Sequence, residues 1–253
     1  MAYNQDNDYL MIVKVDNQCN IKLININQCN YVNSLADNLK SSSSSSSSPS
    51  PSSSSCSLTP SKQLDNKQSE LINLIRSQLK LWINSLGVQS AEAQNLKEPI
   101  TCHTRFIQGS FRSNSPLKHN DSIYFLVHHQ SVNHQPSTTI TNNDNSSDEN
   151  NRIQLNAIGL IRVGFRNLFL QQSEQLVNVN RCFSILDFYI TRQRQGLGKL
   201  LISCVLKDQT ININKCAFDR PTSALLSFLG KHFNLGSPQK QHNRFVIYDG
   251  FFS

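Results

Sequence analysis

A glycine-rich turn, Gln193-Arg-Gln-Gly-Leu-Gly198, joins the apolar run Ile185-Leu-Asp-Phe-Tyr-Ile190 to Lys199-Leu-Leu-Ile202. The first N–H groups of a helix have no partner within it, and the helix dipole attracts an anion to them. Gly196 and Gly198 lack a Cβ, so the backbone there can approach a pyrophosphate closely, and Gln193 and Arg194 add side-chain donors. The turn therefore predicts a binding site for a phosphate-containing ligand at the start of a helix.

The position of this turn narrows the classes of nucleotide-binding protein. It follows an interior strand, whereas a dinucleotide-binding Rossmann motif is expected early in the chain, with an acidic residue about 20 positions later. The sequence has no G-x-x-x-x-G-K-[S/T], which excludes a Walker-type loop. None of the seven cysteines forms a C-x-x-C pair, and no metal site is predicted.

The composition limits the kinds of binding partner and the cellular location that are expected. The 253 residues carry a formal charge of +7, with lysine and arginine scattered along the chain. This charge suits an acidic partner, but without a dense basic block it does not favour nucleic acid. No signal peptide is visible, and no segment reaches the roughly 20 apolar residues that a membrane helix needs. We expect a soluble protein of the cytosol or nucleus that binds no membrane.

The apolar pattern predicts strands and helices in an order typical of an α/β fold. The predicted strands are Tyr9–Val15, Ile21–Ile26, Ser122–Val127, Leu155–Gly164, Phe183–Ile190, Ile211–Phe218 and Arg244–Asp249. One helix is expected from Asp65, which with Gln68 resembles a capping box, to a stop at Gly87. Others follow the glycine turn and Pro221. This order indicates a mixed sheet flanked by helices.

Two polar segments lack apolar residues to bury. Ser41–Ser57 is almost entirely serine, and His134–Arg152 is rich in Asn, Ser and Asp. The first is expected to be a disordered linker, with a phosphorylated regulatory tract as the alternative, and the second a long flexible loop.

The glycine turn resembles the Q/R-x-x-G-x-G/A pattern with which GCN5-related N-acetyltransferases (GNAT) bind the pyrophosphate of acetyl-CoA. Further blocks between Asp65 and Phe252 resemble, in order, the α-tubulin N-acetyltransferase family. They are Ala93-Gln-Asn-Leu96 with Pro99-Ile-Thr101, Ile185-Leu-Asp-Phe-Tyr-Ile190, Ala217-Phe-Asp-Arg-Pro-Thr222, Leu225-Leu-Ser-Phe-Leu229, Lys231-His-Phe-Asn-Leu235 and Phe245-Val-Ile-Tyr-Asp-Gly-Phe-Phe252.

The resemblance implies a GNAT-like fold with a mostly antiparallel central sheet, and transfer of acetyl from acetyl-CoA to a lysine ε-amine of α-tubulin in microtubules. It implies a cytoplasmic, cytoskeletal protein, with the axoneme and cilium among its places of action, and we expect a monomer. Residues 1–40 would form a hairpin packing on the catalytic domain, 41–62 a Ser-rich linker, and 63–253 the catalytic domain with a flexible loop at 134–152.

The same resemblance assigns two stretches to acetyl-CoA. Phe188, Tyr189 and Ile190 would lie beside the pantetheine as a strand edge. The turn would hold the pyrophosphate through Gln193, Arg194, Gln195, Gly196, Leu197, Gly198 and Lys199, and the cofactor's other side would face Thr222, Ser223 and Lys231. For the neighbouring Leu225, Phe228 and Leu229 we expect a role in the core.

Two carboxylates are candidates for the chemistry. Asp219 matches the family's catalytic aspartate, and a carboxylate at the end of a buried strand can accept or organise the proton of the attacking amine. The alternative is that Asp219 caps the following helix. Asp187 lies in an apolar run, where an unpaired charge is costly, so it needs a partner or a water-lined site. A buried structural role is the alternative for Asp187.

The chain departs from the family pattern at two catalytic positions. Ser184 replaces the usual cysteine, and Cys182 lies two residues earlier, about 6.6 Å along a strand. A cysteine base is thereby disfavoured, and Ser184 is expected to order a water or to hydrogen-bond the thioester, as suits direct transfer. The family also has a functional glutamine shortly after the Pro-Ile-Thr block. Gln108 corresponds to it if one extra residue lies between, and Ile107 corresponds to it if the alignment has no gap.

Two other functions remain open at this point. The first is an acetyltransferase for a different protein or small-amine acceptor. The second is a catalytically impaired relative that binds microtubules or CoA, which the serine at position 184 motivates.

Overall fold

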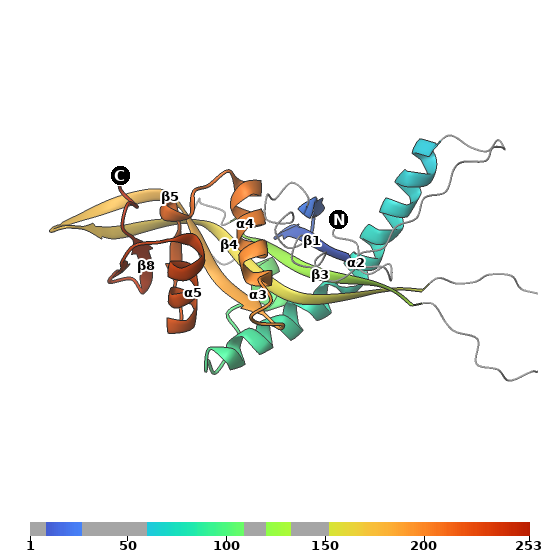
Figure 1. Cartoon of the computed structure of the whole chain (residues 1–253), viewed down its shortest axis with the longest axis horizontal. Helices are drawn as coiled ribbons and strands as arrows, with labels where there is room; N and C mark the ends of the chain where they lie inside the picture. The colour runs from blue at the N-terminus through green and yellow to red at the C-terminus, as the bar shows by residue number, and fades with distance from the viewer. Residues whose placement is uncertain (1–8, 27–59, 109–119, 133–151) are drawn as a thin grey trace, which may run out of the picture.

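The computed structural model describes residues 9–26, 60–108, 120–132 and 152–253 (Figure 1). They form one eight-stranded sheet in the order β2-β1-β3-β4-β5-β6-β8-β7. The strands are β1 (Tyr9–Asp16), β2 (Ile21–Ile24), β3 (Ser122–Val132), β4 (Arg152–Gln172), β5 (Gln175–Ile190), β6 (Ala217–Asp219), β7 (Pro238–Lys240) and β8 (Phe245–Tyr248). All described neighbours are antiparallel except β5 and β6. The predicted mixed, mostly antiparallel α/β fold is confirmed.

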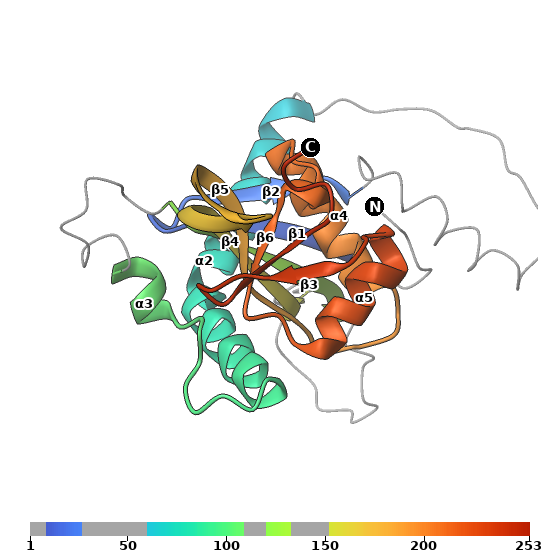
Figure 2. The same cartoon turned by 90° about the vertical axis from the view of Figure 1, so that its left-hand side faces the viewer.

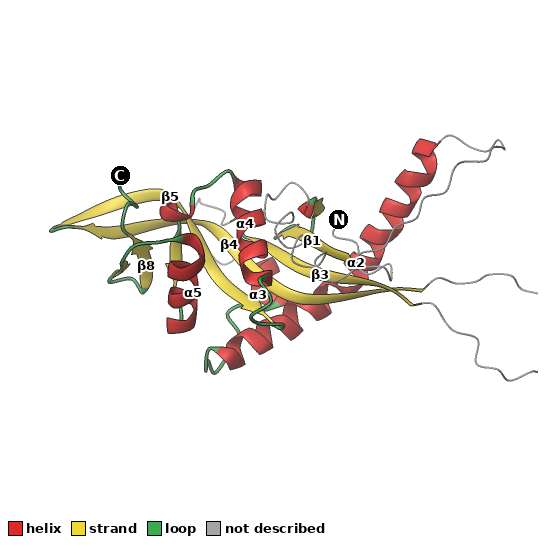
Figure 3. Ribbon diagram, viewed as in Figure 1, coloured by secondary structure: helices red, strands yellow, loops and turns green. Residues whose placement is uncertain are grey.

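Helices cover both faces of this sheet (Figures 2 and 3). The helix α2 (Pro60–Ala93), followed by α3 (His103–Gln108), packs on one face, whereas α4 (Leu197–Gln209) and α5 (Ser223–Phe233) pack on the other. Side chains alternate along a strand, so Phe125 belongs to the core under α2 while Tyr124 and Leu126 belong to the core under α4 and α5. Two apolar layers result, one on each face.

The helix α2 is longer at both ends than the sequence pattern predicts. It begins at Pro60, so the proposed capping box at Asp65 is wrong, and it continues through Gly87, where a stop was expected. A Cβ on Gly87 would lie 1.9 Å from the carbonyl oxygen of Thr101. The glycine therefore permits close contact between the helix and the returning chain, rather than ending the helix.

The strands β4 and β5 are also longer than predicted. Expected as Leu155–Gly164 and Phe183–Ile190, they extend as a hairpin that turns at Ser173, whose φ is +55°. The added residues include many Asn and Gln, which hid the strand pattern. Figure 1 shows this hairpin projecting beyond its neighbours.

Two further differences lie near the C-terminus. The predicted strand Ile211–Phe218 is mostly wrong, because residues Ile213–Lys215 form the 3₁₀ helix η2 and only Ala217–Asp219 form β6. The side chain of Asn212 accepts a hydrogen bond from the N–H of Asn214, which stabilises this turn. The short strand β7 and the helix α3 were not predicted.

The N-terminal hairpin joins the main sheet. β1 pairs along its length with β3, from Tyr9 opposite His129 to Asp16 opposite Ser122. The carboxylate of Asp208, near the end of α4, pairs with Lys14 and Lys22 at 2.8 Å each and accepts a hydrogen bond from Tyr124. These contacts tie β1 and β2 to the C-terminal end of α4.

Most of the two predicted polar segments lies outside the described residues. Of the proposed linker at 41–62, residues 60–62 belong to α2; of the loop at 134–152, Arg152 begins β4. The domain boundaries remain a prediction. No helix in the described ranges carries an apolar stretch sufficient to cross a membrane.

Candidate active site

The sheet opens where its parallel pair ends. β5 and β6 pair only at Ser184 with Ala217 and at Ile185 with Phe218. On the other side of β5 the register with β4 shifts, so that Leu186 is an extra residue between Ile185 and Asp187. A bulge of this kind bends a strand and redirects the next side chain. The residues that follow in β5 and β6 leave a pocket between them.

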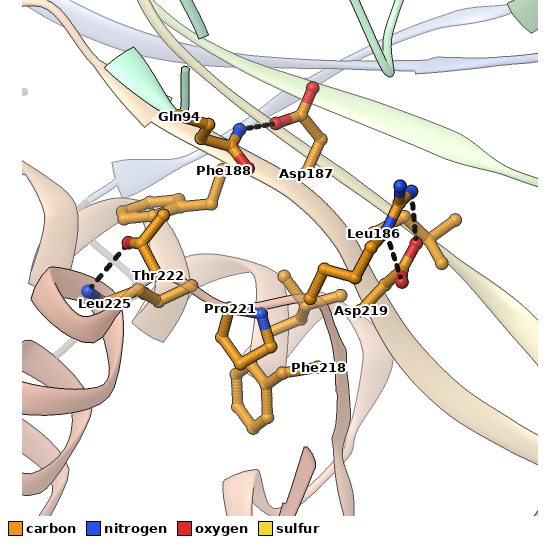
Figure 4. A pocket seen from close by; sticks show the side chains of 11 residues that line it. Gln94, Leu186, Asp187, Phe188, Phe218, Asp219, Pro221, Thr222 and Leu225 are labelled. Carbon is orange, nitrogen blue, oxygen red and sulfur yellow. Dashed lines mark hydrogen bonds and ion pairs between the residues drawn. The ribbon is translucent and has the colours of Figure 1, made fainter. Parts of the chain in front are cut away.

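This pocket brings together three parts of the chain that are distant in sequence (Figure 4). Its lining residues come from the end of α2, from β5, and from β6 with the start of α5. They are Gln94, Ile185, Leu186, Asp187, Phe188, Phe218, Asp219, Arg220, Pro221, Thr222 and Leu225. Both predicted carboxylates therefore line one pocket.

The carboxylate of Asp187 is buried, with 5% of the residue exposed. One oxygen, Oδ1, accepts hydrogen bonds from Ser90 Oγ at 2.7 Å and from Gln94 Nε2 at 3.2 Å. Among the described residues, no hydrogen-bond partner reaches its second oxygen, Oδ2. Asp187 is thus both hydrogen-bonded and part of the pocket wall.

The second carboxylate, Asp219, ends β6 and is more exposed. Its oxygens accept hydrogen bonds from Arg220 Nε at 3.0 Å and Nη2 at 3.2 Å. The pKa of Arg220 is raised, first by this hydrogen bond and further by the charges of Asp219 and Asp187. The proposed capping role of Asp219 is wrong, because Thr222 Oγ1 caps α5 by accepting from the N–H of Leu225 at 3.2 Å.

The glycine turn opens α4, as predicted. Arg194 and Gly196 have positive φ values of +60° and +75°, and α4 begins at the next residue, Leu197. No described side chain caps this helix start. A Cβ on Gly198 would lie 3.2 Å from Phe188 and 3.4 Å from Phe228. A helix start without a side-chain cap, in a tight turn that contains two glycines, fits a pyrophosphate.

The other predicted cofactor residues divide by position. The ring of Phe188 lines the pocket and stacks on Phe228 of α5, with centroids 6.0 Å apart. The same ring lies beside Gly198, so it joins the pocket to the start of α4. The strand continues through Tyr189, which is half-buried, and Ile190, which is buried opposite Gly159. At the turn, Gln193 and Gln195 are exposed and Lys199 is half-buried.

On α5, Thr222 lines the pocket but Ser223 and Lys231 are exposed and do not. Their cofactor contacts remain predictions. In the helix itself Leu229 is fully buried, while Leu225 and Phe228 pack against the core from half-buried positions.

Ser184 is fully buried and does not line the pocket. Its Oγ donates to the carbonyl oxygen of Cys182 at 3.1 Å. Burial raises the pKa of the Cys182 thiol to about 11, so this thiol is protonated near neutral pH. Neither side chain is placed as a base in the pocket, and the role expected for Ser184 remains a prediction.

Gln108 is the last residue of α3 and is exposed, whereas Ile107 packs against the core under α2. Neither lines the pocket. The glutamine that does is Gln94, for which sequence reasoning assigned no role. Its signal was its place in Ala93-Gln-Asn-Leu96, one of the blocks that carry the family resemblance.

Among the described strands the sheet opens at a parallel pair, beside a glycine turn at a helix start, and this is the arrangement expected from the resemblance to the GNAT acetyltransferases. The family model described as "GNAT acetyltransferase, Mec-17" matches residues 143–253, which include both strands of the opening and both helices beside it. This part of the chain is a GNAT acetyltransferase domain of the Mec-17 family, and the resemblance seen in the sequence is confirmed.

Curated relatives extend the match toward the N-terminus. Alpha-tubulin N-acetyltransferase 1 of Drosophila melanogaster is 35% identical over 174 residues, covering 68% of this chain and 32% of the relative. Alpha-tubulin N-acetyltransferase of Aedes aegypti is 31% identical over 201 residues, covering 78% of this chain and 61% of the relative. Alpha-tubulin N-acetyltransferase of Anopheles gambiae is 32% identical over 181 residues, covering 70% of this chain and 31% of the relative. The chain thus spans about a third to three fifths of these relatives.

Proposed function

We propose that this chain transfers acetyl from acetyl-CoA to the ε-amine of a lysine on α-tubulin within microtubules, directly in a ternary complex. The observation that carries the proposal is the pocket at the end of the parallel pair, which holds Asp187 and Asp219 and touches the start of α4 through Phe188. The relatives' names supply the acceptor.

In the proposed complex, the uncapped start of α4 holds the pyrophosphate with the backbone of Gly196 and Gly198. Phe188 then directs the pantetheine into the pocket from the strand edge that continues through Tyr189 and Ile190. Bound acetyl-CoA supplies an activated thioester. No cysteine is among the described residues that line the pocket, which favours direct transfer over an acylated enzyme.

The reaction consumes a lysine ammonium and a thioester and yields an amide, free CoA and one proton. A C–N bond forms and the C–S bond breaks. The nitrogen loses two protons, one of which ends on the CoA sulfur and the other in solvent. We assign the transfer of this second proton to solvent to Asp219, and the assignment is supported by its position in the pocket lining with 18% of its side chain exposed.

The proposed partner is α-tubulin, and the proposed location is the cytoplasmic microtubule, including that of the axoneme. A chain of charge +7 docks on an acidic surface, so the affinity for microtubules should fall as salt rises. An affinity that does not change with salt would argue against electrostatic docking. We propose that the chain acts as a monomer, without nucleic acid, membrane or metal.

The first experiment is incubation of the purified chain with microtubules and acetyl-CoA, followed by mapping of acetylated lysines by mass spectrometry. A single modified α-tubulin lysine supports the proposal. No modification, with acetyl-CoA still bound, points to another protein or small-amine acceptor or to a catalytically impaired relative.

Asp219→Asn separates these outcomes. We expect its kcat to fall about 10²-fold or more, as for the loss of a positioned general base. Turnover equal to that of the parent chain would overturn the assignment of Asp219, while leaving the reaction itself in place.

A further inference from the structure

The outer edge of β4 is bound by side chains where strand pairing ends. β3 pairs with β4 only as far as Val163, so beyond that residue no described strand pairs with this edge. Two side chains from the turn between β7 and β8 bond to the backbone of β4 in this stretch. Gln241 Oε1 accepts from the N–H of Gln171 at 2.6 Å, and Asn243 Nδ2 donates to the carbonyl oxygen of Phe169 at 3.1 Å.

The amide of Gln241 is the buried member of this pair. Gln241 is 8% exposed, whereas Asn243 lies at the surface. Buried polar groups are nearly always hydrogen-bonded, so the contact to β4 fixes where this amide lies. In the same region Leu168 and Leu170 of β4 pack with Ile247 of β8. Figure 1 shows β8 beside the projecting hairpin, to which the turn is therefore attached.

The same turn reaches Asp219 through the backbone. The N–H of Gln241 donates to the carbonyl of Phe245 at 2.8 Å, and the N–H of Arg244 donates to the carbonyl of Gln241 at 3.2 Å. Phe245 is the residue of β8 that pairs with Asp219. Arg220, which follows Asp219, donates its N–H to the carbonyl of Arg244 at 3.1 Å. Two adjacent residues of the turn thus hold the end of β6.

This contact joins two strained residues. Arg220 and Arg244 both have left-handed backbone conformations, with φ +45° and +68°. Residues other than glycine rarely adopt a positive φ, and such strain persists where the surrounding structure holds it. Arg220 also bonds the carboxylate of Asp219 (Figure 4). If the turn is loosened, both arginines can relax, and Asp219 moves with them.

We propose that Gln241 and Asn243 are positioning residues for Asp219: by binding the β7–β8 turn to β4, they fix Arg244 and Arg220 and so direct the carboxylate into the pocket. This inference rests on the proposed acetyl transfer and adds to it two residues that do not line the pocket. Their loss should slow the chemical step without weakening the binding of acetyl-CoA.

The first test is steady-state kinetics of the whole chain with microtubules and acetyl-CoA. Gln241→Met keeps the length of the side chain but removes the acceptor, and we expect its kcat to fall about 10-fold, as for a small misplacement of a catalytic group, with the KM for acetyl-CoA unchanged. The exposed Asn243→Ala should show the same pattern at about 3-fold. In the Asp219→Asn background Gln241→Met should cost no further activity, because the group that it positions is already lost.

Gln239→Met is the matched control. Gln239 lies on β7, two residues before Gln241, and its amide donates to Asp249 Oδ1 at 2.7 Å instead of bonding to β4. Its kinetics should equal those of the parent chain.

Amide hydrogen exchange tests the link without using activity. Gln241→Met should speed exchange at the N–H of Gln171, which loses its partner, and also at the N–H of Arg220, which bonds to Arg244. Faster exchange at Gln171 alone would overturn the link between the turn and Asp219.

Two kinetic results would also overturn the inference. One is a kcat within about 2-fold of the parent chain in Gln241→Met, or in Asn243→Ala if Gln241→Met does not fold. The other is an equal loss from Gln241→Met in the parent and Asp219→Asn backgrounds, which would make the turn only structural. A parent chain that acetylates no lysine would instead refute the proposed function, and hydrogen exchange would still decide whether the turn holds Arg220.

Discussion

The helices α4 and α5 both begin beside the pocket, but their first turns are built differently. α4 starts after Gly196, at φ +75°, with no side-chain cap among the described residues. α5 starts after Thr222, which has an extended backbone conformation. The Thr222 hydroxyl accepts a hydrogen bond from the N–H of Leu225. The start of α4 therefore has no side-chain cap, whereas the start of α5 has one N–H group bonded to a side chain of the chain itself.

This difference indicates which helix start can bind an anion. A capped start has already satisfied part of its orphan N–H groups, so it gains less from a phosphate. The two helices are also held differently, because the far end of α4 is tied by Asp208 to Lys14 and Lys22. An uncapped start on an anchored helix gives a preorganised anion site, whereas the start of α5 contributes shape to the pocket.

The largest expected effect is on the uncapped start. Gly196→Val places a β-branched residue at φ +75° and displaces the backbone donors. Loss of charge-assisted hydrogen bonds should lower acetyl-CoA affinity about 100-fold, measured by calorimetric titration. Gly230→Ala on α5, where a Cβ would meet nothing within 4 Å, is the control. Unchanged affinity in folded Gly196→Val would place the cofactor elsewhere.

A smaller loss of affinity is expected for a substitution two residues later, in the first turn of α4. In Gly198→Ala the new Cβ would lie 3.2 Å from Phe188 and 3.4 Å from Phe228, so these rings must shift by a few tenths of an ångström. We expect acetyl-CoA affinity to fall about 10-fold, the effect of roughly 1.4 kcal/mol. If affinity instead stays level while Tm falls, Gly198 serves only the packing of α4.

The capped start is tested through stability. Thr222→Ala removes the cap and should lower the free energy of unfolding by about 1 kcal/mol, measured by urea denaturation. Thr222→Ser keeps a hydroxyl and should lose only a fraction of that. Equal stability of the two variants would mean that the hydroxyl does not cap α5, and the contrast between the helices would fail.

The smallest effect concerns the anchored end of α4. Burial alone raises the pKa of Asp208, but hydrogen bonds from Lys14, Lys22 and Tyr124 outweigh it and hold the pKa well below its usual range. The carboxylate therefore stabilises the fold above pH ~4, and this contribution is lost as the pH falls further. The pair with Lys22, whose side chain is 65% exposed, is of the surface kind that contributes about 0.2–1 kcal/mol.

Asp208→Asn should accordingly be less stable than the parent chain at pH ~7, with the difference shrinking toward pH ~3, in parallel urea titrations. A stability difference that does not depend on pH would exclude an ionic origin.

The features of the fold and site that could be predicted from the sequence are those determined by the residues of one short segment. The glycine turn before α4 needs only local backbone chemistry, so it was predicted with its helix. Asp187 was found as a polar residue in an apolar run, and Asp219 through its match to the family's aspartate. The end of α2 could not be predicted, because it depends on tertiary contacts: Gly87 lies against Thr101, and Gln94 contacts Asp187, which is 93 residues away in the sequence. The full length of the β4–β5 hairpin was not predicted, because backbone pairing between strands tolerates polar residues on an exposed strand and the apolar pattern is then lost.

The bulge at Leu186 makes the length of β5 as important as its composition. Every residue from Asp187 to Ile190 keeps its face only because one extra residue lies between Ile185 and Asp187. Deleting Leu186 would exchange inward and outward side chains along that end of the strand. Deletion of one residue there should therefore destabilise the protein more than most substitutions at the same positions. The number of residues in this strand is constrained because it sets the face of the sheet to which each side chain points.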